Sequence, residues 1–452
     1  MPTKEQREAT PDDKSLSQSR ERLLGDSSRA DEDVQDVEAP PEQNATSAAG
    51  VSVVLTTAIM LGDMLGLGSL TLPSVFARLG WIPAILVVLL CGLGTVWAGR
   101  LFALLAVKVT RARVFDDFGG AALGNWGRRA VYVTVYATIL AEPIIFHLTS
   151  MEALQQIFYS AGLTQKFAAL LVTAVMVPLA QIQGIEEVSA ISVIGTIGMA
   201  WALGVIAVKL CITPKVAGYA HTRLFPQLHS FGDVPELLVA VFDTVFTFGG
   251  QVNWLRYLMS MQQKRKFPLA VANVSAVMEV AYLMIGCVGY YRLGSDFDKS
   301  KPVTSVLPQD IWTSLANVGL LAHCIIAYMI NLNVWTHLVL HLIAPSKQRE
   351  EDGEEKSSRP AWAVTSVIGI ALSCVVSVTV PFFDIIVAAI GALGDLAAAY
   401  ALPALFVLVL MGSQLPRWER MLCYVVIPVT LLLSVVGVGS SVAALVRQVR
   451  QR

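Results

Sequence analysis

The feature that most constrains this chain is a series of apolar runs that recurs from about residue 51 nearly to the carboxyl end. Each run holds about 20 residues, and a helix of that length crosses the roughly 30 Å hydrocarbon core of a bilayer. The chain is 55% apolar and only 15% charged. The sequence therefore predicts an all-α membrane protein with about eleven transmembrane helices in a lipid bilayer. The expected spans are residues 51–76, 82–107, 130–158, 167–183, 188–211, 236–261, 269–291, 311–342, 361–380, 384–411 and 421–446.

The two ends of the chain differ from its middle in composition. Residues 1–48 are rich in Asp, Glu, Ser, Gln and Arg, so they cannot bury enough apolar surface to offset the entropy of ordering. We expect a disordered cytosolic tail there, followed by a transmembrane domain over residues 49–446. Residues 447–452 are expected to be a short basic tail.

Lysine and arginine gather in the loops after the second, sixth and eighth expected spans. All of these loops fall on the side of the amino-terminal tail. Because short cytosolic loops are enriched in Lys and Arg, this side is expected to be the cytosolic one. An odd number of spans then places Arg447 and Arg450 on the opposite side, against the same rule.

Several classes of function find no support in the sequence. The six cysteines are isolated, without the Cys and His spacing of a metal site. The chain has no motif of a metalloprotease, a serine hydrolase or a nucleotide-binding loop, and no basic field with interleaved aromatic residues. We therefore expect no enzyme, no metal, no cofactor and no nucleic-acid partner, while protein partners stay unknown.

The first expected span is interrupted at its centre. Residues 66–73 read GLGSLTLP and begin three positions after Asp63. Glycine has poor helix propensity and Pro73 lacks an N–H donor, so a continuous helix is not expected here. Unwound backbone at this depth is tolerated where it lines protein or a watery cavity. The alternative is a close-packing face, because Gly62 and Gly66 have the spacing of small residues at helix interfaces.

The sixth expected span repeats the combination of an acid and a glycine break. Residues 246–250 read FTFGG and follow Asp243 closely. Broken helices at corresponding positions of two halves are typical of inverted-repeat transporters. In such folds the ends of the half-helices face the substrate and its coupling ion.

These motifs resemble those of the amino acid/auxin permease family, also called the transmembrane amino acid transporter family. Residues 66–73 with the following Gly80-Trp81 are similar to its first-helix signature, and residues 246–251 are similar to its sixth helix. Residues 289–294, GYYRLG, are similar to the end of its seventh helix. The resemblance covers the chain from about residue 49 to residue 446, and Asp63 lies where fungal-type neutral amino acid permeases carry an acid.

The resemblance implies a leucine-transporter-type fold, which is a five-plus-five inverted repeat with one extra helix. It also implies amino acid transport coupled to H⁺ or Na⁺, but it fixes neither the substrate nor the membrane. We expect an integral multi-pass protein of the plasma membrane or a vacuolar or lysosomal-type membrane. The expected substrate is a small neutral amino acid. The expected substrate-binding residues are Gly66, Leu67, Gly68, Ser69, Phe246, Thr247, Phe248, Gly249 and Gly250.

Ionisable side chains in spans are functional candidates because each costs about 2.5 to 3.5 kcal/mol on insertion scales. The candidates for proton coupling are Asp63, Asp243, Glu142 and His323. The eighth span offers no Ser or Thr oxygen over residues 318–332, and Na⁺ requires oxygen ligands, which favours proton symport. Asn331 and Asn333 keep Na⁺ coupling as one alternative. An amino acid sensor with little flux is another, because it would keep the same site.

Overall fold

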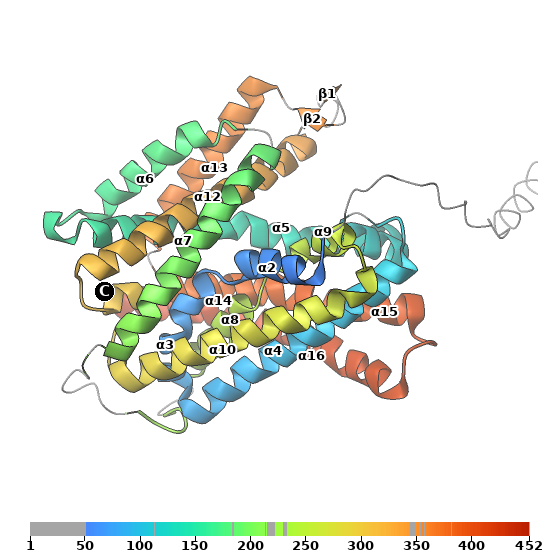
Figure 1. Cartoon of the computed structure of the whole chain (residues 1–452), viewed down its shortest axis with the longest axis horizontal. Coiled ribbons are helices and arrows are strands. Elements are labelled where there is room, and N and C mark those ends of the chain that lie inside the picture. Colours follow the sequence, from blue (N-terminus) through green and yellow to red (C-terminus); the bar gives the residue numbers. More distant parts are fainter. Residues whose placement is uncertain are drawn as a thin grey trace, which may run out of the picture. The chain divides into compact units, whose positions relative to one another are not determined.

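The computed structural model describes residues 51–112, 114–182, 185–212, 214, 222–228, 233–343, 349–351, 354–356, 358–380 and 382–451. The expected tail over residues 1–48 lies outside the described residues, and it belongs to a unit separate from the one that begins at Gly50. The described part is helical except for two short strands (Figure 1). The first half consists of α2 (Val53–Met64), η1 (Leu67–Thr71), α3 (Leu72–Leu79), α4 (Trp81–Lys108), α5 (Phe115–Ile157), η2 (Tyr159–Ala161), α6 (Gln165–Leu179) and α7 (Ile185–Ile212).

The second half begins with a further divided helix. Its elements are α8 (Val234–Thr247), η4 (Gln251–Asn253), α9 (Trp254–Ser260), η5 (Lys264–Lys266), α10 (Phe267–Leu293), α11 (Val303–Val306), α12 (Ile311–Ile343), α13 (Arg359–Thr379), α14 (Phe383–Ile390), η7 (Gly391–Asp395), η8 (Ala397–Ala401), α15 (Leu402–Met411) and α16 (Arg417–Gln451). Strands β1 (Arg349–Glu351) and β2 (Glu354–Lys356) pair antiparallel with Arg349 opposite Lys356. Because α16 continues through Gln451, the end expected as a basic tail is helical as far as that residue.

Seven helices in the described part are long and apolar enough to cross a membrane, and α2 with η1 and α3 makes an eighth if that bent pair is one span. Helices occupy all the expected span ranges, but not all as continuous apolar spans. Helix α6 has only 15 residues, and the sixth expected span is divided between α8 and α9. The all-helical membrane fold is thus established, whereas the count of eleven and the inverted repeat stay predictions.

Small residues allow the closest helix contacts. A side chain at Gly198 of α7 would come within 2.6 Å of the Gly319 carbonyl of α12, and one at Gly319 would meet the Gly198 carbonyl at 2.5 Å. Glycine therefore lets these two backbones touch, as expected for helices packed without a hydrophobic driving force. Gly99 of α4 packs in the same way against Val271 of α10, and these two helices lie side by side (Figure 1).

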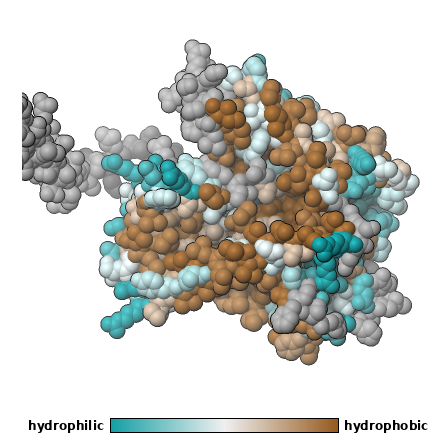
Figure 2. All heavy atoms as spheres, turned by 180° about the vertical axis from the view of Figure 1, so that it is seen from behind, coloured by the Kyte–Doolittle hydropathy of each residue, from teal (hydrophilic) through white to brown (hydrophobic). Residues whose placement is uncertain are grey.

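The outer face is apolar, as a surface in contact with lipid should be. Figure 2 shows hydrophobic residues over much of the visible face, with hydrophilic groups gathered toward the edges. Helix α16 is the clearest case, since Leu432 and Val435 are 65% and 73% exposed. Such apolar exposure on a water-soluble surface would favour aggregation, so it fits a bilayer environment.

Candidate functional site

Two broken helices meet at the centre of the molecule. Helix α2 ends at Met64, and the chain resumes as η1 at Leu67 after an extended Gly66, with a bend of 54° between α2 and the helix that follows. Helix α8 ends at Thr247, and the left-handed Gly250 (φ +106°) leads into η4 and α9. Both breaks fall where the glycines predict them. A side chain at Gly68 would lie 2.6 Å from the Thr247 Cα atom, so the two segments touch.

The two broken helices run in opposite directions. The start of the first, Val51, pairs with Met261 just after α9, through hydrogen bonds from the Val51 N–H to Ser260 and from the Gln262 N–H to Val51. The far end of α3 lies against α8, where Arg78 meets Asp243. Residues before the break on one helix are therefore at the same end of the molecule as residues after the break on the other.

Tyr282 of α10 joins the two breaks. Its hydroxyl lies 2.9 Å from the Thr247 carbonyl and 3.3 Å from the Met64 carbonyl, and the side chain is fully buried. One hydroxyl proton is thus shared between the last carbonyl of α8 and that of α2. The Tyr282 ring also packs edge-on against Phe248 at 5.2 Å. Sequence reasoning missed this residue, although a hydroxyl in the middle of an apolar span was a signal.

The first break leaves consecutive backbone donors unpaired. In the described part of the chain, the N–H groups of Gly66, Leu67 and Gly68 donate no hydrogen bond, whereas the next one, from Ser69, donates to the Gly66 carbonyl at 3.2 Å. The first N–H groups of a helix have no partner within it and carry a partial positive charge. This end is consequently a potential anion site, and the Ser69 hydroxyl supports it by donating to the same Gly66 carbonyl at 2.8 Å.

Most carbonyl groups of the second break already have donors. The Phe246 carbonyl accepts from the Gly249 N–H at 2.8 Å, and that of Phe248 accepts from the Gln251 side chain at 2.7 Å. The Thr247 hydroxyl donates to the Asp243 carbonyl at 2.6 Å. Among described groups the Gly249 carbonyl has no donor, and the carbonyl of Leu65, which follows α2, has none either. These two carbonyls are the acceptors left for a cation.

Three carboxylates surround the second break. Asp63 is exposed and accepts from the Asn253 side chain at 3.2 Å, and the Tyr257 hydroxyl lies nearby. Glu142 of α5 lies near the Asn331 side chain and within electrostatic range of Asp63. The Asp395 carboxylate of η7 is so close to Gly249 that a side chain there would approach it at 3.1 Å.

None of these three acids forms an ion pair with a Lys or Arg side chain among the described residues. Asp395 was not among the expected site residues because its place depends on how α14 and η7 wind. Glu142 directly precedes Pro143 within α5 and lies within electrostatic range of Asp63, and its role in proton coupling stays a prediction.

Asp243 does not share the surroundings of Asp63. It is fully buried with one carboxylate oxygen 3.9 Å from an Arg78 guanidinium nitrogen, and the same guanidinium bonds to Asp384 at the start of α14. Because the broken helices are antiparallel, the two acids that precede the breaks lie at opposite ends of the central region. In this conformation Asp243 therefore does not share the surroundings of the first break with Asp63, and its role in proton coupling stays a prediction.

His323 also lies apart from the breaks. Its ring Nδ1 is 3.2 Å from the Gly195 carbonyl, and its ring packs near Phe146, so it ties α12 to α7. A second histidine, His147, was missed by sequence reasoning. It is fully buried between Thr173 of α6 and Ser377 of α13, at 3.1 and 3.0 Å. Both rings occupy helix interfaces in this conformation.

Gly80, Trp81 and Tyr290, from the remaining motifs, contact a loop at the outer end of the molecule. We define the outer end as the end away from the basic segment η5. Gly80 has φ +77°, and a side chain there would meet the Arg223 carbonyl at 2.9 Å. The next N–H, from Trp81, donates to that same carbonyl at 3.0 Å, while the Arg223 N–H donates to the Tyr290 hydroxyl at 2.7 Å. The Trp81 and Tyr290 rings pack at 5.1 Å. We call residues 222–228 the outer strap.

The sequence comparison decides the family. Residues 49–447 match the family described as transmembrane amino acid transporter protein. The chain belongs to this family. As a transmembrane amino acid transporter family member it is a multi-pass membrane protein and not an enzyme, as expected.

Similar proteins agree with this assignment. The protein named Amino acid transporter ANT1 from Arabidopsis thaliana is 21% identical over 90% of this chain and 95% of its own length. Amino acid transporter AVT1D from the same plant is 22% identical over 85% of this chain and 68% of its own length. Amino acid transporter AVT1H, also from Arabidopsis thaliana, is 23% identical over 80% and 82%. The closer likeness to fungal-type members is not shown and stays a prediction.

Proposed function

We propose that this family member carries small neutral amino acids across its membrane together with protons. The observation that supports the proposal is the run of unpaired N–H groups at Gly66, Leu67 and Gly68, together with the Leu65 and Gly249 carbonyls, which have no donor among the described groups. An amino acid needs both, because its carboxylate requires donors and its ammonium group requires acceptors. Ser69 and the residues from Phe246 to Gly250 carry no charged side chain, which supports a neutral substrate.

Asp63 is the leading site of proton coupling in this proposal. It reaches an exposed position beside the breaks, is held by the Asn253 side chain and has no ion-pair partner in the described part of the chain. A carboxyl group in such a place can exchange a proton with one aqueous side. Coupling follows when substrate binds one protonation state more tightly than the other. Glu142 is the second candidate, and Asp243 and His323 remain lesser ones because of their structural contacts.

The deciding experiment is uptake of radiolabelled amino acids into liposomes that contain the purified protein, with pH and Na⁺ gradients imposed separately. Accumulation driven by an acidic exterior and indifferent to Na⁺ is the expected result. Asp63→Asn should still exchange substrate across the membrane but lose most pH-driven accumulation, because Asn keeps the size and loses the exchangeable proton. Asp298→Asn, in the outer loop beside Lys301, is the control. Full pH-driven accumulation by Asp63→Asn would remove Asp63 from the mechanism.

The carboxylate site is tested by Gly66→Ala. A side chain at Gly66 meets only the Met64 carbonyl at 3.9 Å, and its φ of −128° suits any residue, so the variant should fold. The added methyl group would stand beside the free N–H donors, and we expect substrate affinity to fall about tenfold. Gly204→Ala, which would contact nothing within 4 Å, is the matched control. Unchanged affinity in Gly66→Ala would contradict this site. Gly68 is unsuitable for the test because any side chain there collides with Thr247.

A further inference from the structure

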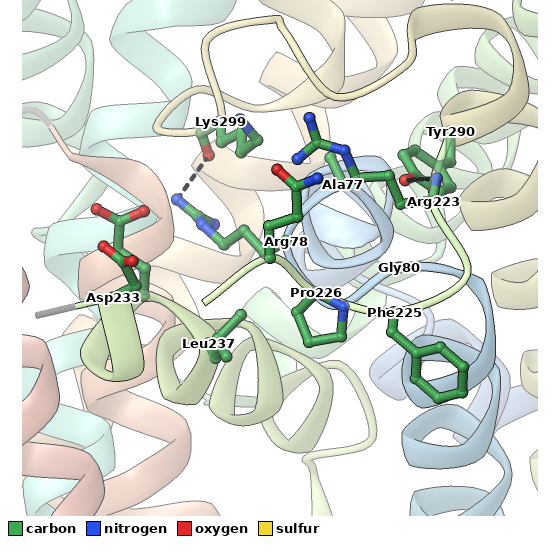
Figure 3. Close-up of a pocket in the computed structure, with 12 residues that line it drawn as sticks. Ala77, Arg78, Gly80, Arg223, Phe225, Pro226, Asp233, Leu237, Tyr290 and Lys299 are labelled. Atoms are coloured by element: carbon green, nitrogen blue, oxygen red, sulfur yellow. Dashed lines mark hydrogen bonds between the residues drawn. The ribbon is translucent and has the colours of Figure 1, made fainter. Parts of the chain in front are cut away.

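A separate cavity of 280 Å³ opens at the outer end of the molecule (Figure 3). It lies between the end of α3, the start of α8, the outer strap and the loop that follows α10. Ligand pockets measure roughly 300 to 1,000 Å³, so this cavity suits a small molecule. Its lining comprises Ala77, Arg78, Gly80, Arg223, Phe225, Pro226, Gln227, Asp233, Glu236, Leu237, Tyr290 and Lys299.

Charges of opposite sign line opposite ends of this cavity. Figure 3 shows Asp233 at one end and Arg223 with Tyr290 at the other, with Arg78 between them. Glu236 belongs to the acidic end, because it and Asp233 both pair with Arg447, at 3.3 and 3.4 Å. The cavity is thus dipolar, with acids at one end and a guanidinium at the other.

The cationic groups are fixed in place but available. The backbone of Arg223 is held by the Tyr290 hydroxyl and by the N–H of Trp81, yet among the described residues its guanidinium forms no ion pair. Lys299 uses its backbone carbonyl to accept from Arg78 at 3.4 Å, and its ammonium group likewise has no ion-pair partner in the described chain.

Arg78 forms the buried floor of the cavity. Its side chain is 5% exposed, and its Nε and Nη1 atoms have no hydrogen-bond acceptor within the described part of the molecule. A buried guanidinium with unused donors is costly unless a further acceptor is present. A ligand carboxylate between Arg223 and Lys299 would come close to these unused donors.

We propose that this cavity is a second binding site for a free amino acid, in which Arg223 and Lys299 hold the carboxylate and Glu236 receives the ammonium group. A zwitterion fits the observed order of charges, whereas a simple anion would leave the acidic end unused and meet repulsion there. Glu236 keeps 44% of its side chain exposed, so its oxygens are accessible beside Arg447. Leu237, Pro226 and Phe225 give the cavity an apolar wall that suits a neutral side chain. The site does not depend on transport through the central region.

Equilibrium binding to the purified full-length protein tests the proposal, with radiolabelled L-alanine as the probe. Propionate, which carries only the carboxylate, and L-alaninamide, which carries only the ammonium group, serve as competitors. Wild type should bind about two alanines per chain, one at each site. Arg223→Gln and Lys299→Gln should each lose the outer component by about tenfold or more, because each removes a charged hydrogen bond. Gly66→Ala should weaken only the central component.

The control substitutions lie nearby but outside the cavity. Lys301→Gln removes an ammonium group two residues from Lys299 that pairs with Asp298 at 3.5 Å, and Arg292→Gln removes a guanidinium that bonds to the Cys211 carbonyl. Both should bind like wild type. A single component that Gly66→Ala weakens and Arg223→Gln leaves intact would overturn the outer site while the proposed function stands. Displacement by propionate as effective as that by alanine would overturn the zwitterion assignment.

Discussion

Residues of the same type take different roles here according to their partners. Asp63 lies exposed at the end of α2 with an amide donor, whereas Asp243 is buried against Arg78 and Asp384. The first can gain and lose a proton without breaking an ion pair. Protonation of the second would leave part of the guanidinium charge without its counterion, a change that is strongly destabilising for a buried pair. Proximity to a break is therefore a poorer guide to coupling than the identity of the neighbouring charge.

Lys299 gives the outer cavity a pH dependence with a definite sign. Burial lowers the pKa of Lys299 below its ordinary value, Arg78 and Arg223 lower it further, and Glu236 and Asp296 oppose this. The ammonium form, which binds a carboxylate, is thus lost at lower pH than in a free lysine. We therefore expect alanine affinity at the outer site to fall as the pH rises, beginning below the range around about pH 10.4 in which a free lysine titrates. Lys299→Arg should flatten the pH dependence of alanine affinity at the outer site. Binding measured in the Gly66→Ala background tests this. The same decline in Lys299→Arg as in the protein with Lys299 would exclude Lys299 as the source of the pH dependence.

At the scale of elements, the sequence indicates where helices break but not what joins them. Gly66 and Gly250 could be predicted as breaks because glycine weakens a helix wherever it stands. The bridge by Tyr282 could not, because its partner carbonyls belong to elements far away in the chain. The ion pair of Asp243 could not be predicted for the same reason, because its partner Arg78 lies on another helix. The residues near each break determine the local helix propensity, whereas contacts between distant residues depend on how the whole chain packs.

Tyr282→Phe tests whether the two breaks act as one unit. Loss of the hydroxyl leaves the carbonyls of Thr247 and Met64 buried without this donor, at a cost of about 1 to 3 kcal/mol in the free energy of unfolding. Transport should fall as well, since the substrate groups lie on the same segments. Thermal unfolding in detergent and liposome uptake provide the two measurements. Tyr424→Phe, on the exposed face of α16, is the control, and equal stability of both variants would refute the bridge.

At the scale of the whole molecule, the contacts at the two chain ends support the orientation predicted from the loops. Val51 pairs with Met261 close to the basic segment η5, while Arg447 near the end of α16 pairs with Asp233 and Glu236 beside the start of α8. The start and the end of the described domain therefore lie at opposite ends of the broken helix made by α8 and α9. Arg447, whose expected position opposes the positive-inside rule, pairs with two carboxylates at this end.

We accordingly expect the amino terminus to be cytosolic and the carboxyl terminus to face the lumen or the exterior. Epitope tags at the two termini, examined by protease protection in sealed vesicles, should give opposite results. Detection of both tags on one side would remove a span from the count of eleven. Disruption of the Arg447 pairs by Arg447→Gln should leave this orientation unchanged, because early helices and loop charges set it.

The π-helical winding of η7 and η8 changes which residues act as neighbours. In this winding each N–H bonds to the carbonyl five residues earlier, so a turn holds more than four residues in place of the α-helical value of about 3.6. Asp395 ends η7, and Tyr400 lies in η8. The first approaches Gly249 at the second break, and the second reaches the Cys91 carbonyl of α4 at 3.4 Å. If this stretch were wound as a regular α-helix, Asp395 and Tyr400 would point in different relative directions. The contact of Tyr400 with α4 and the position of the Asp395 carboxylate beside Gly249 could then not both be kept.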